Sequence, residues 1–168
     1  MDLIILTGMS GAGKSQAVAF FEDNGYFCID NLPPQFLPEF VSMFSKGEGD
    51  SAGTDKVAFV VDVRSRELLR GLDNALKKID EELSIPYRIV FLEASDEVLV
   101  SRYRQTRRKH PLTDEMSLTD AIAAERKMLE NVRGRATNVI DTTLMPISSL
   151  KKALRALLED DGKVGGIS

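Results

Sequence analysis

The sequence predicts an α/β fold, a three-layer α/β/α sandwich in which helices cover both faces of a mostly parallel five-stranded sheet. Two observations support this prediction. Short apolar runs alternate with segments of helical period along the chain, and a glycine-rich stretch, "GMSGAGKS" at residues 8–15, follows the first apolar run. With 168 residues, of which 43% are hydrophobic, the chain fits one compact domain, which we place at residues 1–158.

Five apolar runs have the length and composition of buried strands. Each is followed by a turn signal or by the start of a helix, as parallel strands joined by helices require. The predicted strands cover residues 3–7, 26–30, 56–62, 87–94 and 137–141.

Amphipathic segments with recognisable starts and stops follow these runs. Asn24-Gly25 ends the first helix, while Ser95 and Ser117 are N-caps of later ones. The predicted helices lie at residues 14–24, 31–44, 65–83, 95–108, 117–132 and 147–160. The Gly/Ser/Asp-rich stretch 45–55 predicts a flexible loop, and residues 159–168 predict a tail or the start of a linker to a further domain.

The spacing Gly8-x-x-x-x-Gly13-Lys14-Ser15 matches the P-loop pattern, and each position has a physical role. The glycines let backbone N–H groups turn toward a phosphate, Lys14 reaches the terminal phosphates, and the Ser15 hydroxyl binds Mg²⁺. The following helix adds the positive end of its dipole. We therefore predict a nucleotide site formed by Gly8, Met9, Ser10, Gly11, Ala12, Gly13, Lys14 and Ser15.

Four of the predicted strands end in an acidic residue, namely Asp30, Asp62, Glu93 and Asp141. Because the carboxyl ends of parallel strands line the ligand crevice, these carboxylates should gather near the glycine loop. We select Asp62 as the second Mg²⁺ ligand, since the most uniformly apolar strand leads to it and such strands are typically central. Asp30 is a candidate base that would orient an acceptor hydroxyl. Asp141 is more simply interpreted as a loop contact.

A basic cluster follows the fourth predicted strand, since five of the eight residues 102–109 are Arg or Lys. An isolated run of this kind is usually a solvated helix face, but this one precedes a break at His110-Pro111. In P-loop phosphotransferases a basic lid at this place closes over the polyphosphate. We predict a lid at about residues 104–117, which includes His110 and contacts phosphate through Arg104, Arg107 and Arg108.

The composition disfavours several other kinds of site. A net charge of −4 gives no general reason to bind nucleic acid, and the single cysteine, Cys28, rules out an intrachain disulfide and suits a small core thiol. The chain shows neither a basic leader nor an apolar run of about 18 residues, so we expect a cytoplasmic protein that does not bind membranes. No Asn-Lys-x-Asp motif occurs, which leaves the base preference open.

The chain resembles the family of P-loop nucleotide-binding proteins related to the bacterial RNase adapter RapZ and to YvcJ. The motifs "TGMSGAGKS", "GYFCIDNLPP", "VVDVRS", "FLEASDEVLVSRYRQTRRKHPL" and "RATNVIDTT" carry this resemblance in order along nearly the whole chain. It implies a P-loop NTPase fold similar to nucleoside and gluconate kinases, and binding and slow hydrolysis of ATP and GTP. It also implies a GTP-associated segment formed by Asp62, Val63, Arg64 and Ser65.

Family members are longer than this chain, and their C-terminal half is credited with RNA binding, metabolite sensing and much of the oligomerisation. RNA or protein partners are therefore not carried over to these residues, and an oligomer is left open. Three functions remain: a regulatory domain with weak ATPase and GTPase activity that needs Mg²⁺; a small-molecule kinase that transfers the γ-phosphate to an acceptor hydroxyl; and a nucleotide-binding scaffold module without hydrolysis.

Overall fold

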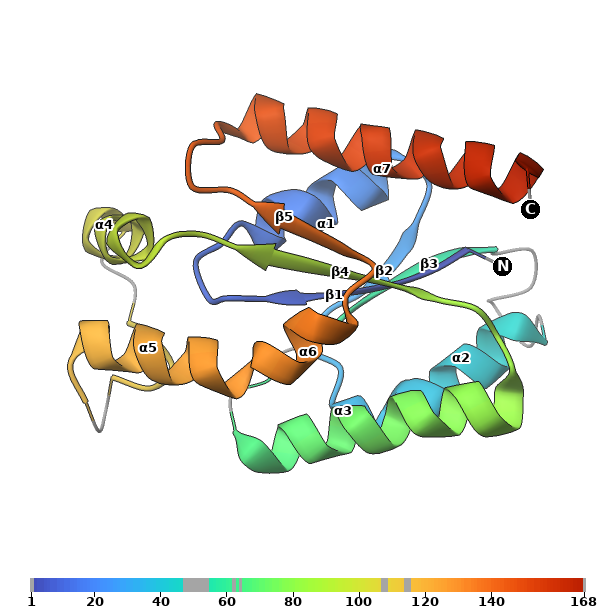
Figure 1. The fold of residues 1–168 in the computed structure, drawn as a ribbon. Helices are drawn as coiled ribbons and strands as arrows, with labels where there is room; N and C mark the ends of the chain where they lie inside the picture. The colour runs from blue at the N-terminus through green and yellow to red at the C-terminus, as the bar shows by residue number, and fades with distance from the viewer. Residues whose placement is uncertain are drawn as a thin grey trace.

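The computed structural model describes residues 2–46, 55–61, 63, 65–106, 109–113 and 116–167. Its strands form one parallel sheet with helices on both faces (Figure 1), which confirms the predicted α/β fold. The strands are β1 (Asp2–Gly8), β2 (Phe27–Ile29), β3 (Lys56–Val60), β4 (Arg88–Glu93) and β5 (Asn138–Asp141), in the order β2-β3-β1-β4-β5.

Strand β1 is the central strand, and its end places the glycine loop. It pairs with β3 as far as Leu6↔Val60 and with β4 as far as Gly8↔Leu92. The side chains from Leu3 to Leu6 are at most 1% exposed, as expected for a parallel strand that is covered on both faces. The first glycine of the loop is therefore still part of the sheet.

The helices form two layers around the sheet. In Figure 1, α1 and α7 lie above the sheet, and α2, α3 and α6 lie below it. The helices are α1 (Lys14–Asp23), the 3₁₀ turn η1 (Pro34–Phe36), α2 (Leu37–Ser45), α3 (Arg66–Lys78), the π-helical turn η3 (Ile79–Leu83), α4 (Asp96–Thr106), α5 (Leu118–Met128), α6 (Glu130–Arg135) and α7 (Ile147–Ile167). No helix in the described ranges has both the length and the apolar content needed to cross a bilayer.

Local cap signals explain several helix starts. The Ser65 hydroxyl accepts a hydrogen bond from the Leu68 N–H at 3.1 Å, and the Ser117 hydroxyl accepts one from the Asp120 N–H at 3.2 Å. Each bond satisfies an N–H group that has no partner within the first turn. The predicted starts of α3 and α5 are therefore correct to within one residue.

Four helices differ from the prediction. The predicted helix 31–44 begins only at Pro34, as a 3₁₀ turn, and is α-helical from Leu37. The predicted helix 117–132 is divided, because Leu129 leaves the α conformation (φ −92°, ψ 1°) between α5 and α6. The predicted helix 65–83 is α-helical only to Lys78 and then widens into a π turn. Helix α7 reaches Ile167, beyond the predicted end at residue 160. The interpretation of residues 159–168 as a tail or linker stays a prediction.

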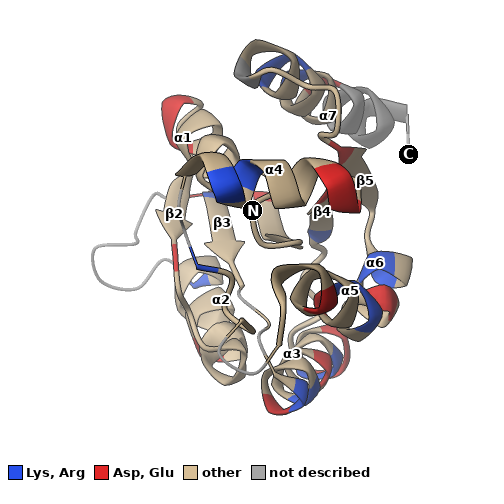
Figure 2. Ribbon diagram, turned by 90° about the vertical axis from the view of Figure 1, so that its left-hand side faces the viewer, with Lys and Arg blue, Asp and Glu red and all other residues tan. Residues whose placement is uncertain are grey.

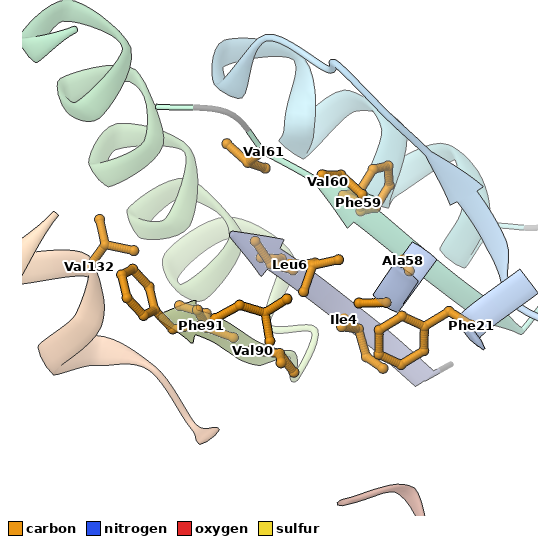
Figure 3. Packing of buried hydrophobic residues seen from close by; sticks show 14 of the residues in the cluster. Ile4, Leu6, Phe21, Ala58, Phe59, Val60, Val61, Val90, Phe91 and Val132 are labelled. Atoms are coloured by element: carbon orange, nitrogen blue, oxygen red, sulfur yellow. The ribbon is translucent and has the colours of Figure 1, made fainter. Parts of the chain in front are cut away.

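Buried side chains fill both faces of the sheet. Figure 3 shows Phe91 of β4 beside Val132 of α6, and Phe21 of α1 beside Ile4 of β1. Successive residues of a strand point to opposite faces, so each strand contributes to both layers of the core. The carboxyl ends of the strands are thereby held at fixed positions, and the candidate site lies there.

Cys28, in strand β2, is half-buried, with Sγ 3.8 Å from the Val18 carbonyl oxygen. Burial, followed by the nearby carboxylates of Glu22 and Asp30, raises the pKa of the Cys28 thiol to about 11. Little thiolate forms at neutral pH as a result, which agrees with the predicted unreactive thiol.

Candidate functional site

A cleft of about 700 Å³ opens at the carboxyl edge of the sheet. Figure 2 looks onto this edge and shows α4 lying across it, with both basic and acidic positions. The lining comes from the glycine loop and the start of α1, from the residues after β2, from α4 and the segment after it, and from the loop before α7. This is the place at which open parallel sheets bind ligands.

The glycine loop has a backbone that requires glycine at three positions. Gly8, Gly11 and Gly13 have φ angles of 142°, 88° and 111°, which side chains strongly disfavour. A Cβ atom at Gly8 would lie 2.2 Å from the Leu92 carbonyl oxygen, because Met9 donates its N–H to that oxygen at 2.9 Å. The loop therefore begins in direct backbone contact with β4.

Lys14 and Ser15 form the start of α1 and line the cleft with the loop. The Lys14 ammonium group donates to the Gly8 carbonyl oxygen at 2.9 Å, so it lies over the loop itself. The Ser15 side chain is exposed at the cleft, whereas Met9 is 1% exposed and belongs to the core. Residues 10–15 of the predicted nucleotide site line the cleft; Gly8 and Met9 support it from below.

Of the three strand-end acidic residues that the structure describes, only Asp30, after β2, lines the cleft. Glu93 instead forms an ion pair with Arg133 at 2.7 Å. Asp141 accepts a hydrogen bond from the Thr143 N–H at 2.9 Å, and the hydrogen bonds from the Thr143 hydroxyl and N–H lower the Asp141 pKa. Glu93 and Asp141 thus have structural partners, as the sequence indicated for Asp141.

The predicted Mg²⁺ ligand Asp62 lies outside the described residues, and so does Arg64. Just before Asp62, the Val61 N–H donates to the Leu6 carbonyl oxygen at 3.0 Å, so the chain still runs beside β1 at Val61. Val63 is 3% exposed and buried in the core, and Ser65 is the N-cap of α3. The Mg²⁺ and GTP roles of residues 62–65 stay predictions.

Arg102 is the basic residue of α4 that holds the glycine loop. Its guanidinium donates to the Gly11 carbonyl oxygen at 3.1 Å, to the Thr142 hydroxyl at 3.0 Å and to the Thr142 carbonyl oxygen at 2.7 Å. The Thr142 hydroxyl in turn donates to the Ala12 carbonyl oxygen at 2.8 Å. Arg102 and Lys109 line the same cleft as Lys14 and bring positive charge to it.

Of the predicted lid arginines, the structure describes only Arg104, so the phosphate contacts of the lid stay a prediction. Arg104 is exposed on α4 and does not line the cleft, while Arg107 and Arg108 lie outside the described residues. The sequence analysis missed Arg102, although a signal for it exists: it lies three residues after Leu99, which is buried, and next to the buried Tyr103. A basic residue on the buried side of a helix is held by specific partners more often than one on the outer side.

A second missed residue is Glu125, which is 3% exposed in α5. Its Oε1 accepts the Ser10 N–H at 2.9 Å, and its Oε2 accepts the Ser10 hydroxyl at 2.6 Å. His110, 1% exposed, lies with Nε2 3.3 Å from the same Oε1. Glu125 lies in the predicted helix 117–132, but neither its burial nor its contact with the glycine loop was predicted.

Comparison with known proteins shows the family to which this chain belongs. The family model described as the RapZ-like N-terminal domain matches residues 1–162. A protein of Moorella thermoacetica named "Nucleotide-binding protein" is 48% identical over 92% of this chain and 52% of its own length. One of Halothermothrix orenii with the same name is 47% identical over 92% of this chain and 53% of its own length. The chain thus spans about half the length of these relatives.

Solved structures with a similar fold include two kinases at low sequence identity. A shikimate kinase from Bacteroides thetaiotaomicron aligns with a TM-score of 0.59 at 18% identity, over 94% of this chain and 98% of its own. A gluconokinase from Sinorhizobium meliloti aligns with a TM-score of 0.56 at 21% identity, over 99% of this chain and 97% of its own. These similarities confirm the P-loop kinase-like fold and say nothing further about activity.

Proposed function

The chain belongs to the family of RapZ-like N-terminal domains, and we propose that it is a regulatory domain that binds ATP and GTP with Mg²⁺ and hydrolyses them slowly. The observation that supports this most is the cleft lined by Lys14, Ser15 and the glycine loop at the carboxyl edge of the sheet. The names of the relatives support nucleotide binding. RNA or protein partners would be sought in the part of those longer proteins that lies beyond this chain.

The residues of the cleft suit a nucleotide triphosphate. Lys14 would exchange the Gly8 carbonyl oxygen for a terminal phosphate oxygen, a charge-assisted and therefore stronger bond. Arg102 and Lys109, which line the same cleft, add positive charge. Ser15 and Asp62 would hold Mg²⁺, which neutralises charge on the β- and γ-phosphates when it is bound.

The proposed regulation would come from the segments that border the triphosphate. Asp30, Asn31, Lys109 and Pro111 line the cleft together with Lys14 and would respond to the presence of the γ-phosphate. Arg104, Arg107 and Arg108 remain the proposed contacts of a lid that closes over it. Slow turnover fits a domain whose task is to change conformation rather than to release product quickly.

One observation favours a small-molecule kinase as a second candidate. Asp30 and Asn31 line the same cleft as Lys14, so an acceptor between them would lie next to the γ-phosphate. The Asn31 N–H donates to the Asp30 carboxylate at 2.8 Å, and Asn31 has a left-handed backbone (φ 58°). This turn would hold the carboxylate in place to orient an acceptor hydroxyl.

The test is phosphate release from ATP and GTP with Mg²⁺, measured for the wild type, Lys14→Ala and Asp62→Ala, with and without a pool of sugars, nucleosides and hydroxy acids. We expect slow release without an acceptor, reduced at least about a hundredfold in both variants because each removes a group that contacts the triphosphate or its metal. Lys77→Ala, an exposed change on α3, is the control and should behave as the wild type.

The other outcomes separate the candidates. If Lys14→Ala binds and hydrolyses nucleotides like the wild type, the proposed site is wrong. Release of ADP that requires an acceptor would make the protein a kinase, and Asp30→Asn would then be the next variant. Tight nucleotide binding without phosphate release above background would indicate a nucleotide-binding scaffold module.

A further inference from the structure

The Glu125 carboxylate connects two separate parts of the cleft wall. It accepts two hydrogen bonds from Ser10 in the glycine loop, and it lies 3.3 Å from His110, which belongs to the segment of residues 109–113 after α4. Ser10, Lys109 and Pro111 line the cleft, whereas Glu125 and His110 do not. The carboxylate therefore contacts the glycine loop and the segment of residues 109–113 without lining the cleft itself.

Both carboxylate oxygens are used in this contact. Ser10 binds Oε1 with its N–H and Oε2 with its hydroxyl, at 2.9 Å and 2.6 Å, which fixes the orientation of the serine relative to α5. A buried carboxylate that loses a partner keeps the full cost of its desolvation, so the loop is held firmly at this position. Two residues later, Thr142 holds the Ala12 carbonyl oxygen at 2.8 Å.

The hydrogen bonds of His110 define which ring nitrogen carries the proton. The Leu112 N–H donates to His110 Nδ1 at 3.1 Å, so Nδ1 is the acceptor and Nε2 carries the hydrogen that points to Glu125. The imidazole also packs against Tyr103, with ring centroids 5.3 Å apart. His110 thus transmits the position of the carboxylate to the backbone of Leu112.

We propose that Glu125 is a positioning residue that holds the glycine loop in its phosphate-binding shape and couples that shape, through His110, to the segment of residues 109–113. This inference rests on the nucleotide binding proposed above. Nucleotide binding at the loop then changes the environment of a histidine ring that does not line the cleft. Glu125 itself touches neither nucleotide nor metal.

The experiment compares Ser10→Ala and Glu125→Gln with the wild type by ATP affinity in the presence of Mg²⁺. Ser10→Ala removes one of the two bonds and leaves the backbone bond in place. Glu125→Gln keeps the shape but puts an N–H donor in place of one acceptor oxygen. We expect ATP affinity to fall roughly ten- to a hundredfold in each variant, as for the loss of one hydrogen bond to a charged group.

The control is Thr137→Val. Its hydroxyl accepts the Ile89 N–H at 3.1 Å near the starts of β5 and β4, at the edge of the sheet opposite the cleft. This variant loses one hydrogen bond, as Ser10→Ala does, so it should lower the melting temperature. Its ATP affinity should equal that of the wild type.

A second measurement detects the coupling itself. His110 is the only histidine in the chain, so its ring nitrogen signals in ¹⁵N NMR are free of overlap. In the wild type, ATP should shift the Nε2 signal, and at saturating ATP this shift should fall to less than about half in Ser10→Ala. A contact that serves stability alone would change the melting temperature and leave this response intact.

The results distinguish two kinds of failure. If the wild type binds no ATP, the proposed function fails and this inference fails with it. If the wild type binds ATP and Lys14→Ala does not, but Ser10→Ala and Glu125→Gln keep both the wild-type affinity and the His110 shift, only the positioning role is overturned.

Discussion

The two walls of the cleft are held in different ways. The glycine loop is held at its start by main-chain contacts, since Met9 donates to the Leu92 carbonyl oxygen at 2.9 Å and Gly8 is still paired with β4. The α4 wall is held by side chains, above all by three hydrogen bonds from the Arg102 guanidinium. A main-chain contact leaves no room for a side chain, whereas a side-chain contact can be shortened or replaced.

Because of this difference, substitutions at different positions of the site should have effects of different size. Changes at the start of the glycine loop must disturb the sheet itself, because β4 cannot move without its neighbours β1 and β5. Changes on the inner side of α4 remove hydrogen bonds but leave the sheet intact. Changes on the outer side of α4 should alter neither, so their effect should be limited to nucleotide turnover.

The largest effect is expected for Gly8→Ala. The new Cβ atom would lie 2.2 Å from a backbone oxygen of β4, at a φ angle of 142°. Backbone atoms cannot rotate away as a side chain does, so we expect the free energy of unfolding to fall by about 3 kcal/mol or more. Urea denaturation followed by circular dichroism measures this change.

Gly134→Ala in α6 is the matched control, because an added Cβ there meets no atom within 4 Å. Its backbone is helical, so alanine should leave stability unchanged or raise it by up to about 1 kcal/mol. Equal losses in the two variants would contradict the importance of the contact between Gly8 and β4.

An intermediate effect is expected for Arg102→Met, which keeps most of the side-chain length and removes every donor. The carbonyl oxygens of Gly11 and Thr142 lose a charged partner, so the free energy of unfolding should fall by about 2 kcal/mol. ATP affinity should fall about tenfold, because positive charge leaves the cleft and the loop loses a support. Urea denaturation and calorimetric titration measure the two effects.

Arg102→Lys separates the two causes. Lysine restores the charge but cannot make the forked contact to Gly11 and Thr142, so it should recover affinity more than stability. Full recovery of both would show that the guanidinium geometry is unimportant and that charge alone holds this wall.

The glycine loop could be predicted from the sequence because its residues are contiguous and the role of each position depends on the residue type at that position. The same holds for the predicted caps Ser95 and Ser117, whose partners lie three residues away. Glu125 and Thr142 bind loop residues that precede them by 115 and 130 positions, and no local pattern specifies such partners. Glu125 is 3% exposed, and helical periodicity does not specify which group a buried carboxylate binds.

The smallest effect is expected for Arg104→Ala, which tests the outer side of α4. The side chain is exposed, so the free energy of unfolding should change by less than about 0.5 kcal/mol. If Arg104 contacts the triphosphate when the proposed lid closes, ATP turnover should fall about threefold, the value of one solvent-exposed ion pair. Steady-state phosphate release at saturating ATP measures this effect, because binding to the open cleft does not involve Arg104.

Arg70→Ala is the control for this change, since Arg70 is exposed on α3, away from the cleft. Both variants lower the net charge by the same amount, so a general loss of electrostatic attraction for ATP would affect them equally. A threefold loss in Arg104→Ala alone would assign a role to the outer side of α4 in the closed state. Equal turnover in both variants would show that Arg104 does not contribute to turnover. Within the described part of α4, Arg102 on the inner side would then be the basic residue that acts on ATP.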